Sequence, residues 1–123
     1  MSDEPRWEFY TSPSGRSPVR DEIAKAKLSK REANSLAKLL TRYVDGQTLD
    51  RDVKFLKQYG LHELRFAADH RSFRLLFVRR LNGGPVLLAL VFAQKKADKL
   101  PSFVFETAKE RRSAWELRDI DRD

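Results

Sequence analysis

The stretch "LHELRFAADHRSFRLLF", from Leu61 to Phe77, decides how this chain folds. Apolar and polar residues alternate in both of its halves, and that period of two is typical of β-strands with one buried face. When the halves are paired as a hairpin across Asp69 and His70, Phe66 lies opposite Phe73. A coherent apolar face of this kind predicts two antiparallel strands joined by a tight turn.

The same register places Arg65 directly opposite Arg74, although like charges that face each other across a ladder are unfavourable. Alternation brings Glu63 to the same side of the sheet as the two arginines. The pairing predicts one face made of Leu64, Phe66, Phe73, Leu75 and Phe77, and an opposite face made of Glu63, Arg65, Arg74, Leu76 and Val78.

Two interpretations of the arginine face follow from the residues. Glu63 could form a purely structural cluster with Arg65 and Arg74 that fastens the sheet to the C-terminal segment. The arginines could instead hold an oxyanion or a phosphate, because the guanidinium group stays charged and binds phosphate oxygens in pairs. Glu63 would then be placed to act as a general base.

Three lysines follow the strand expected to end near Ala93, in the stretch "FAQKKADKLP". Lys95, Lys96 and Lys99 could be a solvated loop. They could equally form a basic groove at the edge of the arginine face.

The rest of the chain predicts an α+β fold with a small, mainly antiparallel sheet, an N-terminal helical hairpin and a C-terminal helix. Ser17-Pro18 and the capping box that starts at Ser29 mark the beginnings of the first two helices. The expected order is β-α-α-β-β-β-α. The strands are expected over Arg6–Ser12, Leu61–Ala68, Ser72–Leu81 and Pro85–Ala93, with a hairpin turn at Asn82-Gly83-Gly84 and the last helix starting near Pro101.

Length, composition and net charge limit the kinds of protein that this chain can be. The 123 residues are expected to form one domain, 1–123, with flexible ends at 1–5 and 119–123. The chain has no cysteine, no charged-then-apolar N-terminal segment and no apolar run of about 20 residues, which favours a cytoplasmic protein without membrane contact. A net charge of +7 suggests a polyanionic partner such as RNA, or a neutralising protein with an acidic face.

Metal or cofactor chemistry has little support in the sequence. His62 and His70 are the only two histidines, and the acidic residues do not suggest a metal cage. Any catalysis is therefore expected to need no metal and no cofactor. His70 lies in the predicted turn beside Arg71, so it either contacts RNA or is simply exposed.

Four segments resemble a known family: "LHELRF", "FRLLFV", "VLLALVFAQKKADKLP" and "ETAKERRSAW". They are similar to the phage-derived, HigB-like branch of the RelE/ParE toxin superfamily, and the resemblance runs from about Trp7 to Trp115. It implies a toxin of a type II toxin–antitoxin system that cleaves mRNA on the ribosome by metal-free attack of the 2′-OH. It also implies an antitoxin partner, commonly with a helix-turn-helix domain, through which the toxin forms oligomers.

The resemblance also implies roles for individual residues. Arg74 would stabilise the transition state, Arg65 and Lys95 would grip phosphates, and Glu63 would be the base. The catalytic set is therefore Glu63, Arg65, Arg74 and Lys95, and the RNA-binding set is Arg71, Lys96, Lys99 and His70.

The sequence departs from the family near its C-terminal end, where many relatives carry a histidine or a tyrosine. Only Phe103 and Phe105 stand there, so Lys95 or Lys96 would have to protonate the leaving group. The departure leaves two alternatives open: a ParE-like toxin that acts on DNA gyrase without nuclease activity, and a non-catalytic RNA-binding module.

Overall fold

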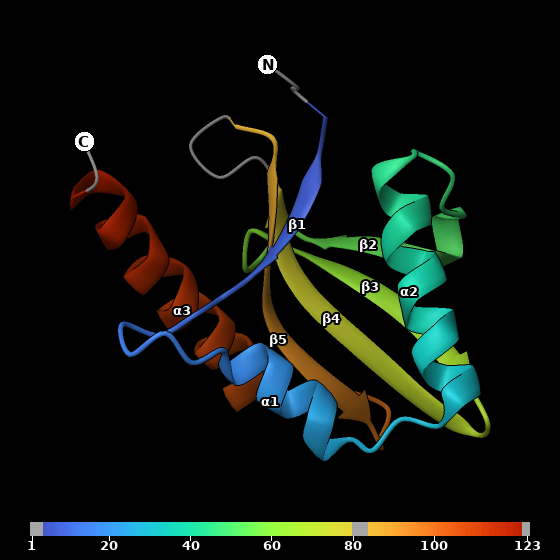
Figure 1. Cartoon of the computed structure of the whole chain (residues 1–123). Coiled ribbons are helices and arrows are strands. Elements are labelled where there is room, and N and C mark those ends of the chain that lie inside the picture. The colour runs from blue at the N-terminus through green and yellow to red at the C-terminus, as the bar shows by residue number, and fades with distance from the viewer. Residues whose placement is uncertain (1–3, 80–83, 122–123) are drawn as a thin grey trace.

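The computed structural model describes residues 4–79 and 84–121, which form an α+β fold with a five-stranded mixed sheet and three helices (Figure 1). The elements in chain order are β1 (Arg6–Phe9), α1 (Pro18–Lys25), α2 (Lys30–Val44), the short 3-10 helix η1 (Asp50–Asp52), β2 (Val53–Leu56), β3 (Leu61–Ala68), β4 (Arg71–Arg79), β5 (Val86–Lys95) and α3 (Ser102–Asp121).

The strands lie in the order β1-β5-β4-β3-β2. β1 runs parallel to β5, whereas every other neighbouring pair is antiparallel, so the sheet is mixed. The expected order β-α-α-β-β-β-α lacked β2, which pairs with the first half of β3. Four residues are too few to show alternation, and β2 is fixed by its neighbour rather than by its own pattern.

The predicted hairpin is confirmed in its register. Arg65 pairs with Arg74 and Phe66 with Phe73 across the β3–β4 ladder. The turn residues Asp69 and His70 both have positive φ, at 51° and 72°. Two positive φ values are the backbone requirement of the tight turn that matches the twist of two antiparallel strands.

The starts of both N-terminal helices are confirmed as well. The Ser17 side chain accepts from the backbone of Arg20, with Pro18 in the first turn of α1. Ser29 and Glu32 form the expected capping box of α2, in which each side chain binds the other residue's backbone N–H. These caps satisfy donors that a helix start would otherwise leave open.

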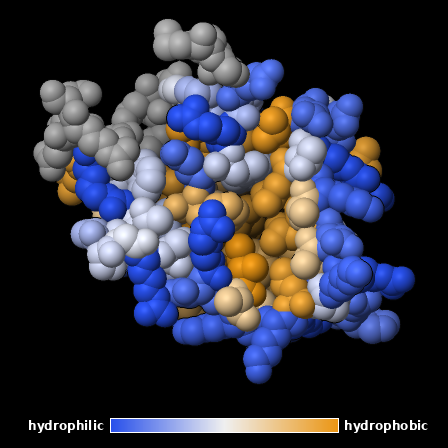
Figure 2. Space-filling view, in the orientation of Figure 1, coloured by the Kyte–Doolittle hydropathy of each residue, from blue (hydrophilic) through white to orange (hydrophobic). Residues whose placement is uncertain are grey.

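The two sheet faces are covered by different helices. α1 packs on β5 and α2 packs on β3, so the expected helical hairpin consists of two helices over different strands (Figure 1). Figure 2 shows apolar residues gathered in the hollow between these helices, with hydrophilic residues around it. α3 covers the opposite face, where its residues Val104, Ala108 and Trp115 are buried.

Arg71 joins the hairpin turn to both N-terminal helices. Its guanidinium donates to Glu32, which is buried, and to the carbonyl oxygens of Ala26 and Lys27 between α1 and α2. Asp69 in the same turn accepts from the Ser29 hydroxyl at 2.7 Å. The end of the β3–β4 hairpin is therefore tied to the α1–α2 connection by charge-assisted hydrogen bonds.

A second ion pair covers the edge of β5. The pairing of β1 with β5 stops at Ala89, and farther along the strand the Phe92 N–H donates to Glu22 while the Leu90 carbonyl accepts from Arg111. Glu22 and Arg111 also bind each other at 2.8 Å. Side chains of α1 and α3 thus bind β5 backbone groups that lie beyond the end of the β1 pairing, which protects a sheet edge.

Several element bounds differ from the expected ones. β1 ends at Phe9 rather than Ser12, and β5 continues to Lys95 rather than ending at Ala93. Most of the expected turn at Asn82-Gly83-Gly84 lies outside the described residues. Among residues 4–79 and 84–121, no helix combines the length and apolar character that crossing a bilayer requires.

Glu32 should make stability depend on pH in the acid range. Its hydrogen bonds with Arg71 and with the Ser29 backbone lower its pKa from 4.5 to about 2. Ionised Glu32 therefore stabilises the fold above about pH 4.5, and this contribution is lost as pH falls toward 2. We expect Glu32→Gln to lower the melting temperature at neutral pH and to flatten its decline in this acid window.

Thermal unfolding followed by circular dichroism checks this expectation. Asp21→Asn is the matched control, because the Asp21–Arg16 pair is on the surface and exposed ion pairs contribute little. An acid decline as steep in Glu32→Gln as in the wild type would contradict the role given to Glu32.

His70→Gly should stabilise the protein by about 0.5 kcal/mol, because glycine removes the steric cost of a positive φ, partly offset by its larger loss of chain entropy. Urea denaturation gives the free energy of unfolding. Ala68→Gly is the control in the adjoining strand and should destabilise by about 0.5–1 kcal/mol. Destabilisation by His70→Gly would mean that the imidazole makes a contact worth more than the backbone strain.

Candidate functional site

The arginine face of the sheet forms one side of a cavity of about 460 Å³, and the start of α3 forms another side. Tyr59, Ser102 and Phe105 are among its lining residues. Basic side chains outnumber acidic ones five to two: the charged lining residues are Lys54, Arg65, Arg74, Lys95 and Lys99, against Glu63 and Asp98. The surplus of positive charge suits an anionic ligand.

Glu63 lies between the two opposed arginines. Arg65 Nε donates to Glu63 Oε1 at 2.7 Å, and Arg74 Nε lies 3.7 Å from the same oxygen. Glu63 comes from the first half of β3 and is buried, with a side chain only 8% exposed. The carboxylate is therefore the internal counter-ion that allows Arg65 and Arg74 to face each other, and the trio keeps one positive charge in excess.

Arg74 is the most restrained member of this trio. Its side chain is 13% exposed, and its Nη1 donates to the Phe73 carbonyl oxygen at 2.9 Å. Burial lowers the pKa of Arg74, the charge of Glu63 opposes this shift, and the charge of Arg65 adds to it. A fixed, poorly solvated guanidinium is a stronger partner for an incoming anion than a flexible surface one.

The lysines after the arginine face divide into two groups. Lys95, at the end of β5, and Lys99 line the cavity with the arginines. Lys96 is exposed, and it is absent from the residues that line this cavity. The structure therefore brings together all four residues of the predicted catalytic set and Lys99 of the RNA-binding set.

Arg71 and His70 lie at the far end of the hairpin. The Arg71 guanidinium is held by Glu32 and by two carbonyl oxygens, and His70 is exposed in the turn. Their expected RNA-binding role remains a prediction, and neither residue lines the cavity around Arg74.

Lys54 and Tyr59 line the cavity but were not predicted from the sequence. Lys54 comes from β2, the strand that the sequence did not predict, and it pairs with Glu63 in the ladder. Tyr59 lies in the β2–β3 turn and stacks on Phe105 of α3, with ring centroids 4.5 Å apart and planes 2° from parallel. No local motif marks these residues, because the β2–β3 pairing and the packing of α3 bring them to the site.

The cavity is suited to bind a phosphate and to move protons near it. Arg65, Arg74 and Lys95 offer donors from three neighbouring strands, Glu63 can accept a proton, and Lys95 can donate one. Rigid strands hold such donors more closely than loops do. Within the described ranges, no three side chains of the metal-ligating types come together.

Comparison with known proteins identifies the family of this chain. The model of a family described as phage-derived protein Gp49-like matches residues 25–113, which is more than half of the chain. The matched region contains all strands except β1, and with them every residue that lines the cavity. No curated protein matches the chain.

Because Glu63 competes with any anion for the two arginines, Glu63→Gln should tighten phosphate binding by about tenfold, the order expected for removing one nearby opposing charge. Arg74→Ala should abolish this binding. Isothermal titration of each variant with inorganic phosphate measures the change. Glu110→Gln, on an exposed part of α3, is the matched control and should bind like the wild type. Unchanged or weaker binding by Glu63→Gln would contradict an anion site between the arginines.

Proposed function

Since the chain belongs to the Gp49-like family of phage-derived proteins, within the RelE/ParE-like superfamily of toxins, we propose that it is a HigB-type toxin that cleaves mRNA on the ribosome. The observation that carries the proposal is the buried Glu63 carboxylate between Arg65 and Arg74, in a cavity that also holds Lys95. A phosphodiester cleaved without a metal needs such a base beside fixed positive charges.

In the proposed reaction, the 2′-oxygen of one nucleotide attacks the adjacent phosphorus. The 2′-O–P bond forms, the bond from phosphorus to the 5′-oxygen breaks, and the products are a 2′,3′-cyclic phosphate and a 5′-OH. Glu63 accepts the proton of the 2′-OH, and Lys95 donates one to the departing 5′-oxygen. We assign this last step to Lys95 rather than Lys96 because only Lys95 lines the cavity.

The arginines have separate roles in this proposal. The Arg74 side chain is only 13% exposed and donates to the Phe73 carbonyl oxygen, so it is placed to stabilise the charge that builds up on the phosphorane. Arg65 is more exposed and grips the phosphate as it enters, exchanging its bond to Glu63 for one to the ligand. Tyr59 and Phe105 offer an aromatic wall on which a neighbouring base can stack.

The proposed partners follow from the same reaction. The substrate is mRNA presented by the ribosome, and the neutralising partner is an antitoxin with a helix-turn-helix domain, through which the toxin forms oligomers. The excess of positive charge on the chain agrees with both partners, because each offers a negatively charged surface or strand.

Arg74→Ala should lower the rate of mRNA cleavage at least about 100-fold, the usual cost of removing a group that stabilises transition-state charge. The matched control is Arg79→Ala, which removes an arginine of the same strand that lies over the Tyr43 ring. The measurement is transcriptome-wide mapping of new RNA 5′ ends shortly after induction, with circular dichroism to show that both variants fold.

New in-frame ends in translated messages, present with the wild type and Arg79→Ala but absent with Arg74→Ala, would support the nuclease. Growth arrest without new ends would overturn it and would favour a ParE-like toxin that acts on DNA gyrase. Cleavage retained by Arg74→Ala would overturn the assignment of the site.

A further inference from the structure

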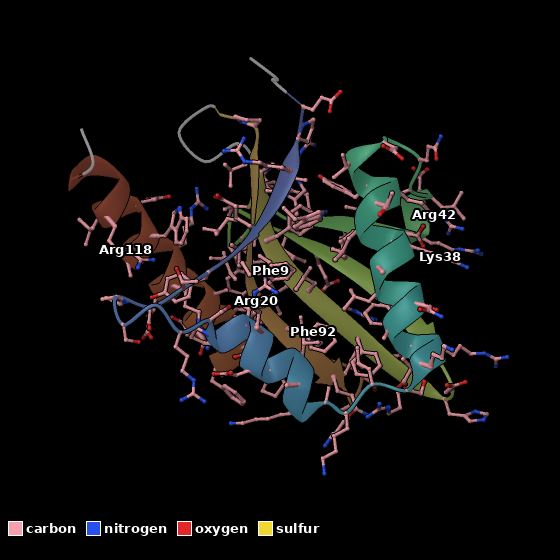
Figure 3. The ribbon with its side chains drawn as sticks, in the orientation of Figure 1. Phe9, Arg20, Lys38, Arg42, Phe92 and Arg118 are labelled. Carbon is pink, nitrogen blue, oxygen red and sulfur yellow. The ribbon has the colours of Figure 1, made fainter. Side chains whose placement is uncertain are left out.

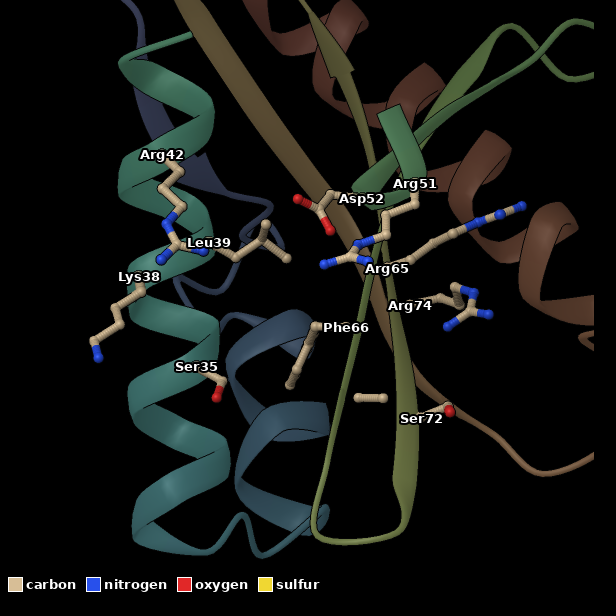
Figure 4. Close-up of a pocket in the computed structure, with 11 residues that line it drawn as sticks. Ser35, Lys38, Leu39, Arg42, Arg51, Asp52, Arg65, Phe66, Ser72 and Arg74 are labelled. Carbon is tan, nitrogen blue, oxygen red and sulfur yellow. The ribbon is translucent and has the colours of Figure 1, made fainter. Parts of the chain in front are cut away.

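A second and larger groove, of about 730 Å³, lies on the other side of β3, between that strand and α2 (Figure 4). Its walls are α2, η1 and the second half of β3, and Leu39 of α2 and Phe66 of β3 lie between these walls. β2 pairs with β3 only as far as Leu64, so none of the strands in the described part of the chain pairs with this edge of β3 along the groove. The groove is therefore built on a sheet edge that the fold leaves open.

Basic side chains from two elements surround this groove. Lys38 and Arg42 are one helical turn apart on α2, and Figure 3 shows both extending from the helix into solvent. Arg51 of η1 reaches into the space between α2 and β3 (Figure 4). In the part of the chain that the structure describes, none of the three forms an ion pair, and the one carboxylate of the groove, Asp52, accepts from the Leu49 N–H.

The groove and the candidate active-site cavity adjoin each other, because they share two lining residues. Arg65 and Arg74 line both cavities, and Figure 4 shows them extending from the sheet on the side away from α2. A chain of phosphates that leaves the arginine pair can cross the open edge of β3. Arg51 is the first cation beyond that edge, followed by Arg42 and Lys38 on α2.

We infer that this groove binds the phosphates of the RNA strand that flank the cleaved bond, so that the substrate runs from the active-site cavity over the edge of β3 to α2. The inference rests on the proposed function, and it adds a second RNA-binding subsite and a path for the RNA across the protein surface. Lys38, Arg42 and Arg51 line the groove but not the cavity that holds Glu63, so they do not touch the reacting atoms. Their role in this inference is to hold the RNA strand in register. They are positioning residues rather than catalytic ones.

An acidic peptide that adds a strand to β3 is the competing occupant, since an open edge offers backbone hydrogen bonds. RNA is favoured because the cations lie on α2 and η1 rather than along the edge itself. It is favoured also because the groove continues into the phosphate-binding cavity. Successive phosphates of one strand need this continuity, and a peptide confined to the groove does not.

The test measures binding rather than cleavage, so its result does not depend on the nuclease activity. The probes are 2′-O-methyl oligouridylates of about 2 to about 10 nucleotides, which cannot undergo attack by a 2′-OH, with affinity followed by fluorescence anisotropy over a range of salt. Lys38→Gln/Arg42→Gln/Arg51→Gln is compared with the matched control Lys25→Gln/Lys30→Gln/Lys109→Gln. The control removes the same charge from exposed positions that line neither cavity.

We expect affinity to rise with probe length in the wild type and in the control. The groove variant should bind the shortest probe normally and should bind the longest about tenfold more weakly, with a salt dependence reduced by about 2 for three lost phosphate contacts. Equal losses in the two triple variants would overturn the inference, because net charge alone would then explain binding. A groove-dependent affinity for an oligo-glutamate peptide without any for the oligouridylates would also overturn it and would assign the groove to a protein.

Discussion

The register of the β3–β4 hairpin is the constraint on which the rest of this structure depends. Asp69 and His70 accept positive φ values, and the turn they form sets Arg65 opposite Arg74. A slip of one residue would turn each side chain of β3 to the other face, so that Phe66 would turn toward α3 and Arg65 toward the side covered by α2. Arg71 opposes such a slip, because its guanidinium binds Glu32 and the Ala26 carbonyl oxygen at the end of α1 and so fixes the position of the turn.

A buried carboxylate between two arginines reconciles the structural and the functional interpretation of this face. In the absence of a ligand, Glu63 neutralises part of the charge and lets the strands pair at little electrostatic cost. Arg65 is the more exposed arginine, so it is the one that can leave the carboxylate when an anion arrives. The same cluster can therefore stabilise the fold and, in the function proposed above, bind a phosphate.

The sequence predicted what is encoded locally. The alternation from Leu61 to Ala68 and the capping box at Ser29 indicated a strand, a hairpin register and a helix start that the structure confirms. It did not reveal β2, whose four residues become a strand only through pairing with β3, nor Tyr59, which joins the site because α3 packs beside it. Features set by contacts between distant segments leave no local pattern in the sequence. The basic groove beside α2 is another such feature, because its lining residues come from α2, η1, β3 and β4.

The ion pair between Glu22 and Arg111 also affects when the edge of β5 can be covered during synthesis of the chain. It covers the edge of β5 with one side chain from α1 and one from α3, which are 89 residues apart in the sequence. A ribosome makes the chain from its N-terminus, so Glu22 is synthesised well before Arg111. The Glu22 carboxylate therefore waits for Arg111 while the residues between them are made, and the Leu90 carbonyl of β5 gains its side-chain cover only once α3 has been synthesised.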